Sequence, residues 1–235
     1  MAEKNWLVEN WKEVNENVRR ACRKAGRPEE EVTLIAVSKT KPLEMLQTVY
    51  GEGARDYGEN KVQEMCDKMD QMPEDVKWHM IGHLQTNKVK YIVGRTHLIH
   101  SVDSLKLAEE IERQAAKKEC LVDILIEVNI AEEESKFGIS KEETISLVRE
   151  IAKLPHLRIK GLMTIAPYVT DPEDNRLFFR GIKDLSVDIK MQNIDNVSMD
   201  VLSMGMTGDY MVAIEEGATL VRVGTGIFGE RNYNK

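Results

Sequence analysis

The stretch VTLIAVSKTK, residues 32–41, contains the pattern that decides the fold. Its first seven residues are a short, apolar, β-branched run, which is typical of a strand buried on both faces of a parallel sheet. A helical pattern precedes it, with apolar residues every three or four positions up to Gly26 and Pro28 just beyond. The stretch therefore predicts a buried strand after an N-terminal helix, with polar residues at the carboxyl end of the strand.

Similar runs recur along the chain, each separated from the next by a helical segment. We expect eight strands, at 32–38, 54–58, 76–82, 97–102, 123–129, 158–165, 197–205 and 219–224. Several intervening helices carry start signals, namely Pro42, Asp103 as an N-cap, Ser140 with Glu143 three residues later, and Asp171 before Pro172.

Strands that alternate with helices imply parallel pairing through right-handed crossovers. Eight such units in 235 residues predict an α/β fold of the (β/α)₈ TIM barrel type, with an extra N-terminal helix. An open, doubly wound sheet is the alternative on pattern alone. We expect residues 1–235 to form a single domain, because barrels of this type routinely use about 200–250 residues as one domain.

The composition excludes several classes of function. Hydrophobic residues make up 42% of the chain and charged residues 31%, as in a globular protein with a core. The net charge of −7 argues against general binding of nucleic acid or an anionic membrane. The three cysteines lie far apart and suggest neither a disulfide framework nor a metal site, which fits a reducing cytoplasm. No secretory signal or membrane span is expected.

In a barrel of this type the active site lies at the carboxyl ends of the strands. Lys39 follows the first strand with the parity of Ile35 and Val37, so we expect its amine at the mouth, where desolvation would free it to attack a carbonyl. A surface lysine in a loop is the alternative. Lys41, before Pro42 at a helix start, is expected to be ordinary.

The last strand ends in a second group of candidate residues. Arg222 interrupts an apolar strand, and an inward arginine is costly unless it meets an anion or a strong acceptor. Gly224, Thr225 and Gly226 follow it, where small residues allow backbone N–H groups to approach a phosphate. Ser203 in the preceding strand adds a hydroxyl, and Thr207 follows it. These residues predict an anion-binding cup, with a tight structural turn as the alternative.

Three polar residues near the second and third strands are weaker candidates. Asn60 follows the second strand, and His79 and His83 lie four residues apart around Gly82. The glycine and the strand pattern spoil the helix face that a metal-binding histidine pair needs. We expect no metal site, and we interpret His79 as a hydrogen-bonded core residue.

Several runs of the sequence resemble the pyridoxal phosphate homeostasis protein family. They are IAVSKTKP (35–42), YGENKVQE (57–64), WHMIGHLQTNK (78–88), SVDS (101–104), GLMTI (161–165), LSMGMTGDYMVAIEEGAT (202–219) and VRVGTGIFG (221–229). They occur in order over nearly the whole chain. The resemblance implies a barrel of the alanine racemase N-terminal domain type and the cofactor pyridoxal 5'-phosphate.

The resemblance also implies roles for individual residues. Lys39 is similar to the family's Schiff-base lysine, and Arg222 to the residue that faces the pyridine nitrogen. The other implied cofactor-binding residues are Ser203, Gly224 and Thr225 at the phosphate and Asn60 near the ring. The chain departs from the family pattern at Thr207, where serine is commoner, and at Gly226, where alanine is commoner. Both residues are small, so we expect an effect on fine geometry rather than on binding.

Two classes of function fit this resemblance. The first is a protein of intracellular cofactor homeostasis that stores, protects or delivers pyridoxal phosphate through Lys39, without substantial catalysis on amino acids. The implied acceptors are apoenzymes that use the cofactor, and we expect a cytoplasmic monomer. An arginine at the ring nitrogen favours this class, because it cannot keep the ring protonated as an acid does.

The second class is an amino-acid racemase, which needs a base on each face of the ring. In racemases the second base comes from an additional β domain of a partner subunit. Residue 235 lies only ten positions after Thr225, which leaves no room for such a domain, so we favour the binding protein. A sugar-phosphate barrel enzyme with Lys39 as its amine is a third reading.

Overall fold

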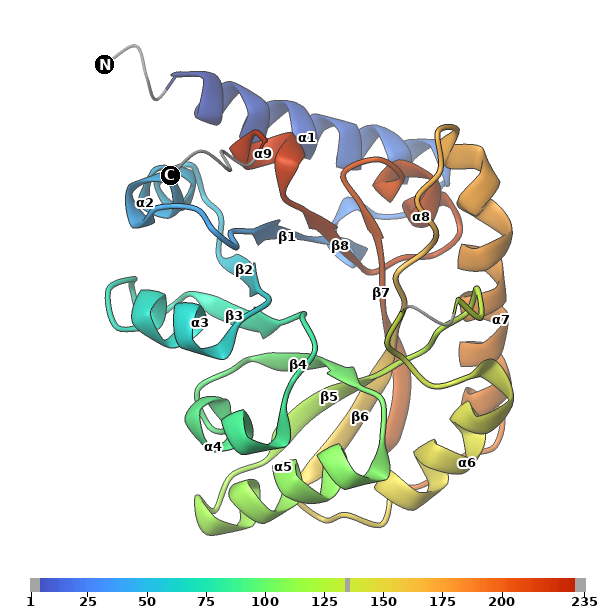
Figure 1. Ribbon diagram of the computed structural model, residues 1–235. Helices are drawn as coiled ribbons and strands as arrows, with labels where there is room; N and C mark the ends of the chain where they lie inside the picture. The colour runs from blue at the N-terminus through green and yellow to red at the C-terminus, as the bar shows by residue number, and fades with distance from the viewer. Residues whose placement is uncertain (1–4, 134–135, 231–235) are drawn as a thin grey trace.

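The computed structural model describes residues 5–133 and 136–230, and in it eight parallel strands close into a barrel (Figure 1). The strands are β1 (Thr33–Val37), β2 (Asp56–Glu59), β3 (Lys77–Met80), β4 (Leu98–Val102), β5 (Val122–Glu127), β6 (Leu157–Met163), β7 (Val197–Met206) and β8 (Leu220–Val223). Each strand pairs with the next along the chain, and β1 pairs with β8. The predicted barrel is confirmed, and the open sheet is wrong.

Helices surround the barrel and connect its strands (Figure 1). They are α1 (Asn5–Lys24), α2 (Leu43–Gly51), α3 (Val62–Met69), α4 (Val89–Ile92), α5 (Leu105–Lys117), α6 (Lys141–Ile151), α7 (Arg176–Lys190), α8 (Tyr210–Glu215) and α9 (Thr225–Phe228), with the short 3₁₀ helices η2 (Glu29–Glu31), η3 (Thr86–Lys88) and η4 (Pro172–Asn175). The extra N-terminal helix α1 packs against α2, α8 and α9.

Side chains alternate between the barrel interior and the helix layer, as a strand period of two requires. The interior cluster contains Ile35, Val37, Ile81, Leu98, Leu125, Met163 and Leu220. Ala36, Val221 and Val223 belong to the outer core. Ile35 and Val37 therefore face inward as expected, and Arg222 shares the parity of the inward Leu220.

The helix starts agree with the sequence in two of three places where a side-chain cap was expected. Ser140 accepts a hydrogen bond from the backbone N–H of Glu143, and Asp171 does the same for Glu173. The N-cap of α5 is Ser104 and not Asp103, because the Ser104 hydroxyl reaches the third N–H of the helix. Helix α9 was not predicted.

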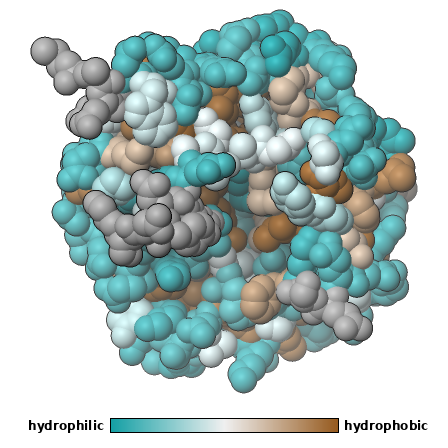
Figure 2. Space-filling view, turned by 45° about the horizontal axis from the view of Figure 1, so that its top comes forward, coloured by the Kyte–Doolittle hydropathy of each residue, from teal (hydrophilic) through white to brown (hydrophobic). Residues whose placement is uncertain are grey.

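Hydrophilic residues make up most of the face seen in Figure 2, and hydrophobic residues show in a hollow near its middle. None of the helices in the described ranges has the length and apolar character needed to cross a membrane.

Candidate functional site

The turn after β1 carries Lys39 at the barrel mouth. Lys39 is half-buried and follows the inward residues Ile35 and Val37. The next residue, Thr40, has a φ of 64°, a left-handed conformation that a β-branched residue rarely adopts. Its backbone N–H donates to Glu64 Oε1 at 2.6 Å. A contact from α3 therefore holds this strained turn in place.

A buried ion-pair network lies behind the turn. The Lys68 ammonium donates to the Ser38 carbonyl at 2.8 Å and to the carboxylates of Glu59 and Glu64 at 2.7 Å each. Ser38 Oγ also donates to Glu59 Oε1 at 2.6 Å. Burial raises the pKa of Glu59, and the charge of Lys68 opposes that rise. Lys68 directs its protons at these three acceptors, so it braces the turn that carries Lys39.

Asn60 follows β2 and packs closely against Gly82. A Cβ on Gly82 would lie 2.5 Å from the Asn60 carbonyl oxygen and 2.6 Å from its Cα, so this approach requires glycine. The side-chain oxygen of Asn60 is buried and has no hydrogen-bond partner among the described residues. A buried amide in this state is suited to a ligand contact.

Arg222 lies in the barrel interior and is only 4% exposed. It donates to Ser203 Oγ at 2.7 Å and to the Thr164 carbonyl at 2.9 Å. Burial lowers its pKa to about 10, an effect that Glu127 and Asp209 oppose. The guanidinium therefore remains charged at neutral pH.

A cup of backbone N–H groups forms where Gly224, Thr225 and Gly226 follow β8. Thr207 Oγ1 accepts from Gly224 N at 3.4 Å and from Gly226 N at 3.3 Å. Gly224 also lies close to β1, since an added Cβ would be 3.3 Å from the Val37 carbonyl oxygen. Thr225 is exposed at the rim. Convergent N–H groups and a hydroxyl make this cup suitable for an anion.

Ser203, an expected phosphate contact, lies apart from this cup. Its side chain is fully buried, and its hydroxyl contacts Arg222 Nη1 at 2.7 Å and His100 Nδ1 at 2.9 Å. β7 continues past Ser203 to Met206, within one residue of the expected strand end, so Ser203 lies inside the barrel. Thr207 follows the strand end and provides the hydroxyl at the cup.

The sequence interpretation missed Glu127 at the end of β5. Its side chain is buried, and Oε2 has no hydrogen-bond partner among the described residues. Burial raises its pKa to about 7; the charge of Asp103 adds to the rise, and that of Arg222 opposes it. A signal was present, because Glu127 interrupts an apolar strand with the parity of the inward Leu125, as Arg222 does in β8.

His79 is a hydrogen-bonded core residue, as expected. Its Nδ1 lies 2.9 Å from Nε2 of His100, which the sequence analysis did not single out. His83 is exposed instead, and its ring stacks on that of Phe137 with centroids 4.0 Å apart. His79 and His83 therefore have different surroundings, one inside the barrel and one at the surface.

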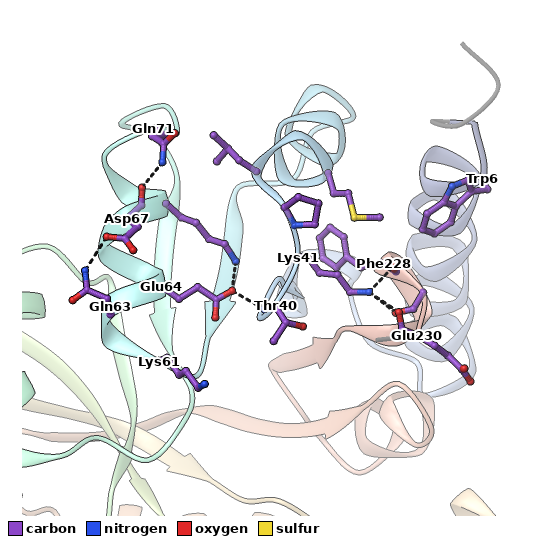
Figure 3. Close-up of a pocket in the computed structure, with 15 residues that line it drawn as sticks. Trp6, Thr40, Lys41, Lys61, Gln63, Glu64, Asp67, Gln71, Phe228 and Glu230 are labelled. Carbon is purple, nitrogen blue, oxygen red and sulfur yellow. Dashed lines mark hydrogen bonds and ion pairs between the residues drawn. The ribbon is translucent and has the colours of Figure 1, made fainter. Parts of the chain in front are cut away.

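A groove of about 1290 Å³ lies beside the turn after β1 (Figure 3). Parts of α2, α3 and the segment around α9 line it. Lys41 points toward the end of α9 and donates to the carbonyls of Phe228, Gly229 and Glu230 at 2.9 Å each. Lys41 thus ties the turn after β1 to the C-terminal segment. The groove neighbours the candidate site, while Lys39 and Arg222 are not among its lining residues in the described part of the chain.

Comparison with known proteins assigns the family. A family model described as alanine racemase, N-terminal domain, matches residues 10–232. The pyridoxal phosphate homeostasis protein of Aquifex aeolicus (strain VF5) is 46% identical over 221 residues, covering 94% of this chain and 96% of the relative. The chain belongs to the pyridoxal phosphate homeostasis protein family. The pyridoxal phosphate homeostasis protein of Escherichia coli (strain K12) is 36% identical and covers 98% of this chain and 99% of its own length.

Solved structures of similar proteins have the same barrel fold as this member of the pyridoxal phosphate homeostasis protein family. The structure of PipY of Synechococcus elongatus PCC7942 with PLP bound has a TM-score of 0.78 at 31% identity and covers 91% of this chain and 100% of PipY. An alanine racemase of Clostridium difficile 630 has a TM-score of 0.75 at 13% identity, with 96% of this chain matched to 58% of the racemase. The second likeness concerns the fold alone. The predicted barrel type and the family resemblance are confirmed.

Proposed function

We propose that this protein binds pyridoxal 5'-phosphate at the barrel mouth and takes part in its homeostasis by storing, protecting or delivering it. Support comes from the name that its relatives share and from PipY, whose structure is described with PLP bound. The observation that carries the proposal is one barrel end that combines a half-buried amine, a buried cation and a cup of backbone N–H groups. These groups are Lys39, Arg222, and Gly224 with Gly226.

The donor set fits the cofactor group by group. Bound pyridoxal phosphate supplies an aldehyde that a lysine amine can join covalently. In our proposal Lys39 holds the aldehyde, and the hydroxyl of Thr207 with the N–H groups of Gly224 and Gly226 holds the phosphate. Arg222, which only donates hydrogen bonds, faces the acceptor nitrogen of the ring.

Two further residues complete the proposed site. Asn60 has a buried side-chain oxygen near the mouth with no hydrogen-bond partner among the described residues, and in our proposal this amide orients the ring. Thr225 is exposed at the rim of the cup and can add a hydroxyl to the phosphate. Ser203 acts indirectly in this proposal, through its hydrogen bond with Arg222.

Arg222 is the reason for proposing a carrier rather than an enzyme. An acid at the ring nitrogen would keep it protonated and make the ring an electron sink. A guanidinium with a pKa of about 10 instead keeps its protons at neutral pH and offers only a hydrogen bond. We therefore propose a protein without substantial catalysis on amino acids.

An amino-acid racemase is the second candidate, and Glu127 is the observation that favours it. A buried carboxyl with a pKa of about 7 near the barrel mouth is suited to accept a proton at neutral pH. Racemisation needs a second proton-handling group on the opposite face of the substrate, and the amine of Lys39 is the candidate for it.

All the groups of the proposed site come from one chain, so we propose that a monomer binds the cofactor. Apoenzymes that use pyridoxal phosphate are the proposed acceptors, and the cytoplasm is the proposed location.

Titration of cofactor-free protein with pyridoxal phosphate, followed by visible absorption, tests the proposal. We expect one equivalent to bind with a new visible band. The loaded protein is then incubated with L-alanine in deuterated water, and we expect far less than one α-proton exchange per second. Absence of the band would refute binding, and many turnovers per second, lost in Lys39→Ala, would favour the racemase.

A further inference from the structure

A row of polar side chains, which we call the interior chain, crosses the barrel from the first residue of β2 to Arg222. Its members are Asp56, His79, His100, Ser203 and Arg222. Asp56 Oδ1 lies 3.0 Å from His79 Nε2, His79 Nδ1 lies 2.9 Å from His100 Nε2, His100 Nδ1 lies 2.9 Å from Ser203 Oγ, and Arg222 Nη1 lies 2.7 Å from Ser203 Oγ. Five strands thus contribute to one continuous line of hydrogen bonds.

The two end groups determine which atom donates and which accepts in each hydrogen bond of the interior chain. Arg222 can only donate, so the Ser203 oxygen accepts from it, and the single Ser203 proton is left for His100 Nδ1. A neutral His100 then carries its proton on Nε2 and donates to His79 Nδ1. His79 likewise donates from Nε2 to the Asp56 carboxylate. Every atom in the line is satisfied when both rings are neutral and protonated on Nε2.

The opposite direction leaves a buried group unsatisfied. If His100 Nδ1 donated to Ser203, the Ser203 oxygen would accept two hydrogen bonds and its own proton would need another acceptor. His79 would then have to be cationic or Asp56 protonated. An unmade buried hydrogen bond costs about 1–3 kcal/mol.

The middle of the interior chain is shielded from water, so water cannot replace a missing hydrogen bond there. His79, His100 and Ser203 are at most 1% exposed, whereas the Asp56 side chain is 15% exposed at the barrel end. Burial holds the pKa of His100 well below its ordinary value, and the neighbouring charge of Arg222 lowers it further.

Arg222 closes the interior chain at its other end. The acidic groups that act on Arg222 are Glu127 and Asp209, and no ion pair links either of them to it within the described residues. Ser203 Oγ and the Thr164 carbonyl are the hydrogen-bond acceptors that hold the guanidinium among the described residues.

We propose that His79 and His100 are positioning residues that couple Asp56 to Arg222 and so hold the guanidinium oriented toward the cofactor. The orientation follows because Ser203, with its proton committed to His100, presents only lone pairs to Arg222. The inference about the cofactor rests on the proposed function, whereas the direction of the interior chain does not.

The direction is tested on cofactor-free protein by ¹⁵N NMR of the imidazole nitrogens. We expect His100 to be neutral from pH 6 to pH 8 with its proton on Nε2, and Nδ1 of His79 to accept from it and carry no proton. A proton on Nδ1 of either ring would overturn the proposal. Neither result depends on whether the protein binds pyridoxal phosphate.

The coupling is tested with His100→Asn and His79→Asn, which leave both direct contacts of Arg222 in place. We expect the Arg222 guanidinium signals to show hindered rotation in the wild type and to average in both variants. The matched control is His97→Phe, since the His97 ring touches His79 edge-on with centroids 5.4 Å apart but lies outside the interior chain. We expect the control to behave like the wild type. Unchanged guanidinium signals in folded His100→Asn would overturn the coupling.

Cofactor affinity gives the second readout. We expect the Kd for pyridoxal phosphate to rise about tenfold or more in Ser203→Ala, which loses a hydrogen bond to the charged Arg222, and to rise in His100→Asn, which frees the Ser203 proton. We expect the Kd to stay within about twofold in His97→Phe. Ser203→Ala removes one oxygen and serves if His100→Asn does not fold. An unchanged Kd in a folded Ser203→Ala protein would overturn the role toward the cofactor. A wild type that binds none would refute the proposed function and leave the NMR result standing.

Discussion

The hydroxyl of Thr207 accepts hydrogen bonds from the backbone N–H groups of Gly224 and Gly226, and we expect it to turn to the cofactor phosphate when that is bound. Thr207→Val keeps the shape of the side chain but removes this group. We expect the Kd for pyridoxal phosphate to rise by about tenfold, because hydrogen bonds to charged groups contribute about 1.5–3 kcal/mol. Fluorescence or absorption titration measures this Kd. Thr207→Ser should bind like the wild type, and equal affinity in the valine variant would contradict the role.

Glu127 should make stability depend on pH in an identifiable way. Its pKa in the folded protein is about 7, above the ordinary value of 4.5 that applies in the unfolded chain. Between these values the native state binds the extra proton, so the free energy of unfolding falls as pH rises from 4.5 through 7. The loss is of order 3 kcal/mol when complete.

Glu127→Gln should remove this dependence. Urea denaturation of cofactor-free protein at pH 5 and pH 8 measures the difference between variant and wild type at each pH. We expect the variant to gain stability relative to the wild type at the higher pH. Glu109→Gln, which changes an exposed carboxyl, is the control and should show no such gain. An equal difference at both pH values would show that Glu127 titrates normally.

For single residues, the alternation along a strand was enough to predict which side chains face the barrel interior. Lys39 and Arg222 were singled out because each continues an inward alternation at or near a strand end. The contacts of Ser203 with Arg222 and His100 could not be predicted, because they depend on how β4, β7 and β8 are aligned across the barrel. His100 was missed because its partners, His79 and Ser203, are aligned only by the register of three strands.

At the scale of elements, the approach of β2 and β3 at the mouth depends on Gly82. Gly82→Ala would place a Cβ 2.5 Å from the Asn60 carbonyl oxygen, so the backbone after β2 must move. We expect a loss of about 1–3 kcal/mol in the free energy of unfolding, as for other overpacked sites. We also expect weaker retention of pyridoxal phosphate, because Asn60 is displaced.

Urea denaturation and cofactor titration measure both effects. Gly51→Ala is the control, because no atom lies within 4 Å of the added Cβ there, and it should leave stability unchanged or slightly raised. A Gly82→Ala protein as stable as this control would contradict the close approach.

Element positions were largely predictable from periodicity, and element ends were less so. The N-cap of α5 shifted by one residue because Asp103 and Ser104 are both good capping residues, and only backbone geometry selects between them. Helix α9 spans only Thr225–Phe228, a length at which no apolar period can be recognised.

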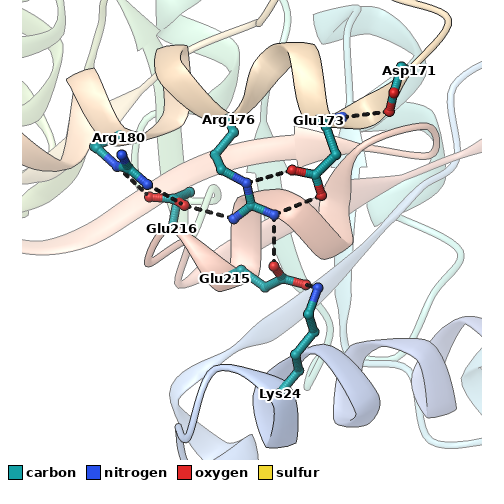
Figure 4. Close-up of polar contacts among 7 residues, drawn as sticks. All are labelled: Lys24, Asp171, Glu173, Arg176, Arg180, Glu215 and Glu216. Carbon is teal, nitrogen blue, oxygen red and sulfur yellow. Dashed lines mark hydrogen bonds and ion pairs between the residues drawn. The ribbon is translucent and has the colours of Figure 1, made fainter.

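At the scale of the whole molecule, a charged cluster joins helices that are distant in sequence (Figure 4). Arg176 on α7 contacts Glu173, Glu215 and Glu216 at 2.7–2.8 Å, and Lys24 on α1 contacts Glu215 at 2.7 Å. These carboxylates raise the pKa of Arg176. The cluster therefore links α1, α7 and the end of α8 around the barrel.

Arg176→Ala should lower the free energy of unfolding by about 1–2 kcal/mol, more than an isolated surface pair, because it leaves adjacent carboxylates facing each other. The loss should shrink in 1 M salt. Lys190→Ala removes an exposed pair with Asp200 and should cost less than about 1 kcal/mol. Urea denaturation at low and high salt measures the loss of unfolding free energy in each of the two variants. Equal losses in the two variants would contradict a cooperative cluster.

The barrel was predictable from the alternation of strands and helices, since parallel pairing and right-handed crossovers leave few arrangements for eight such units. The sequence does not reveal the layers inside the barrel. Those layers depend on strand register, which brings Asp56 into line with Arg222 through three intervening side chains.

The central claim is that Lys39 holds pyridoxal phosphate at the barrel mouth. The most direct test is borohydride reduction of the loaded protein, followed by proteolysis and mass mapping of the modified lysine. We expect the adduct on Lys39 and a loss of the visible band in Lys39→Ala. Lys41 is the internal control, because its ammonium is engaged by the carbonyls of Phe228, Gly229 and Glu230. An adduct on Lys41, or a reduced cofactor that remains unattached to the chain, would contradict the claim.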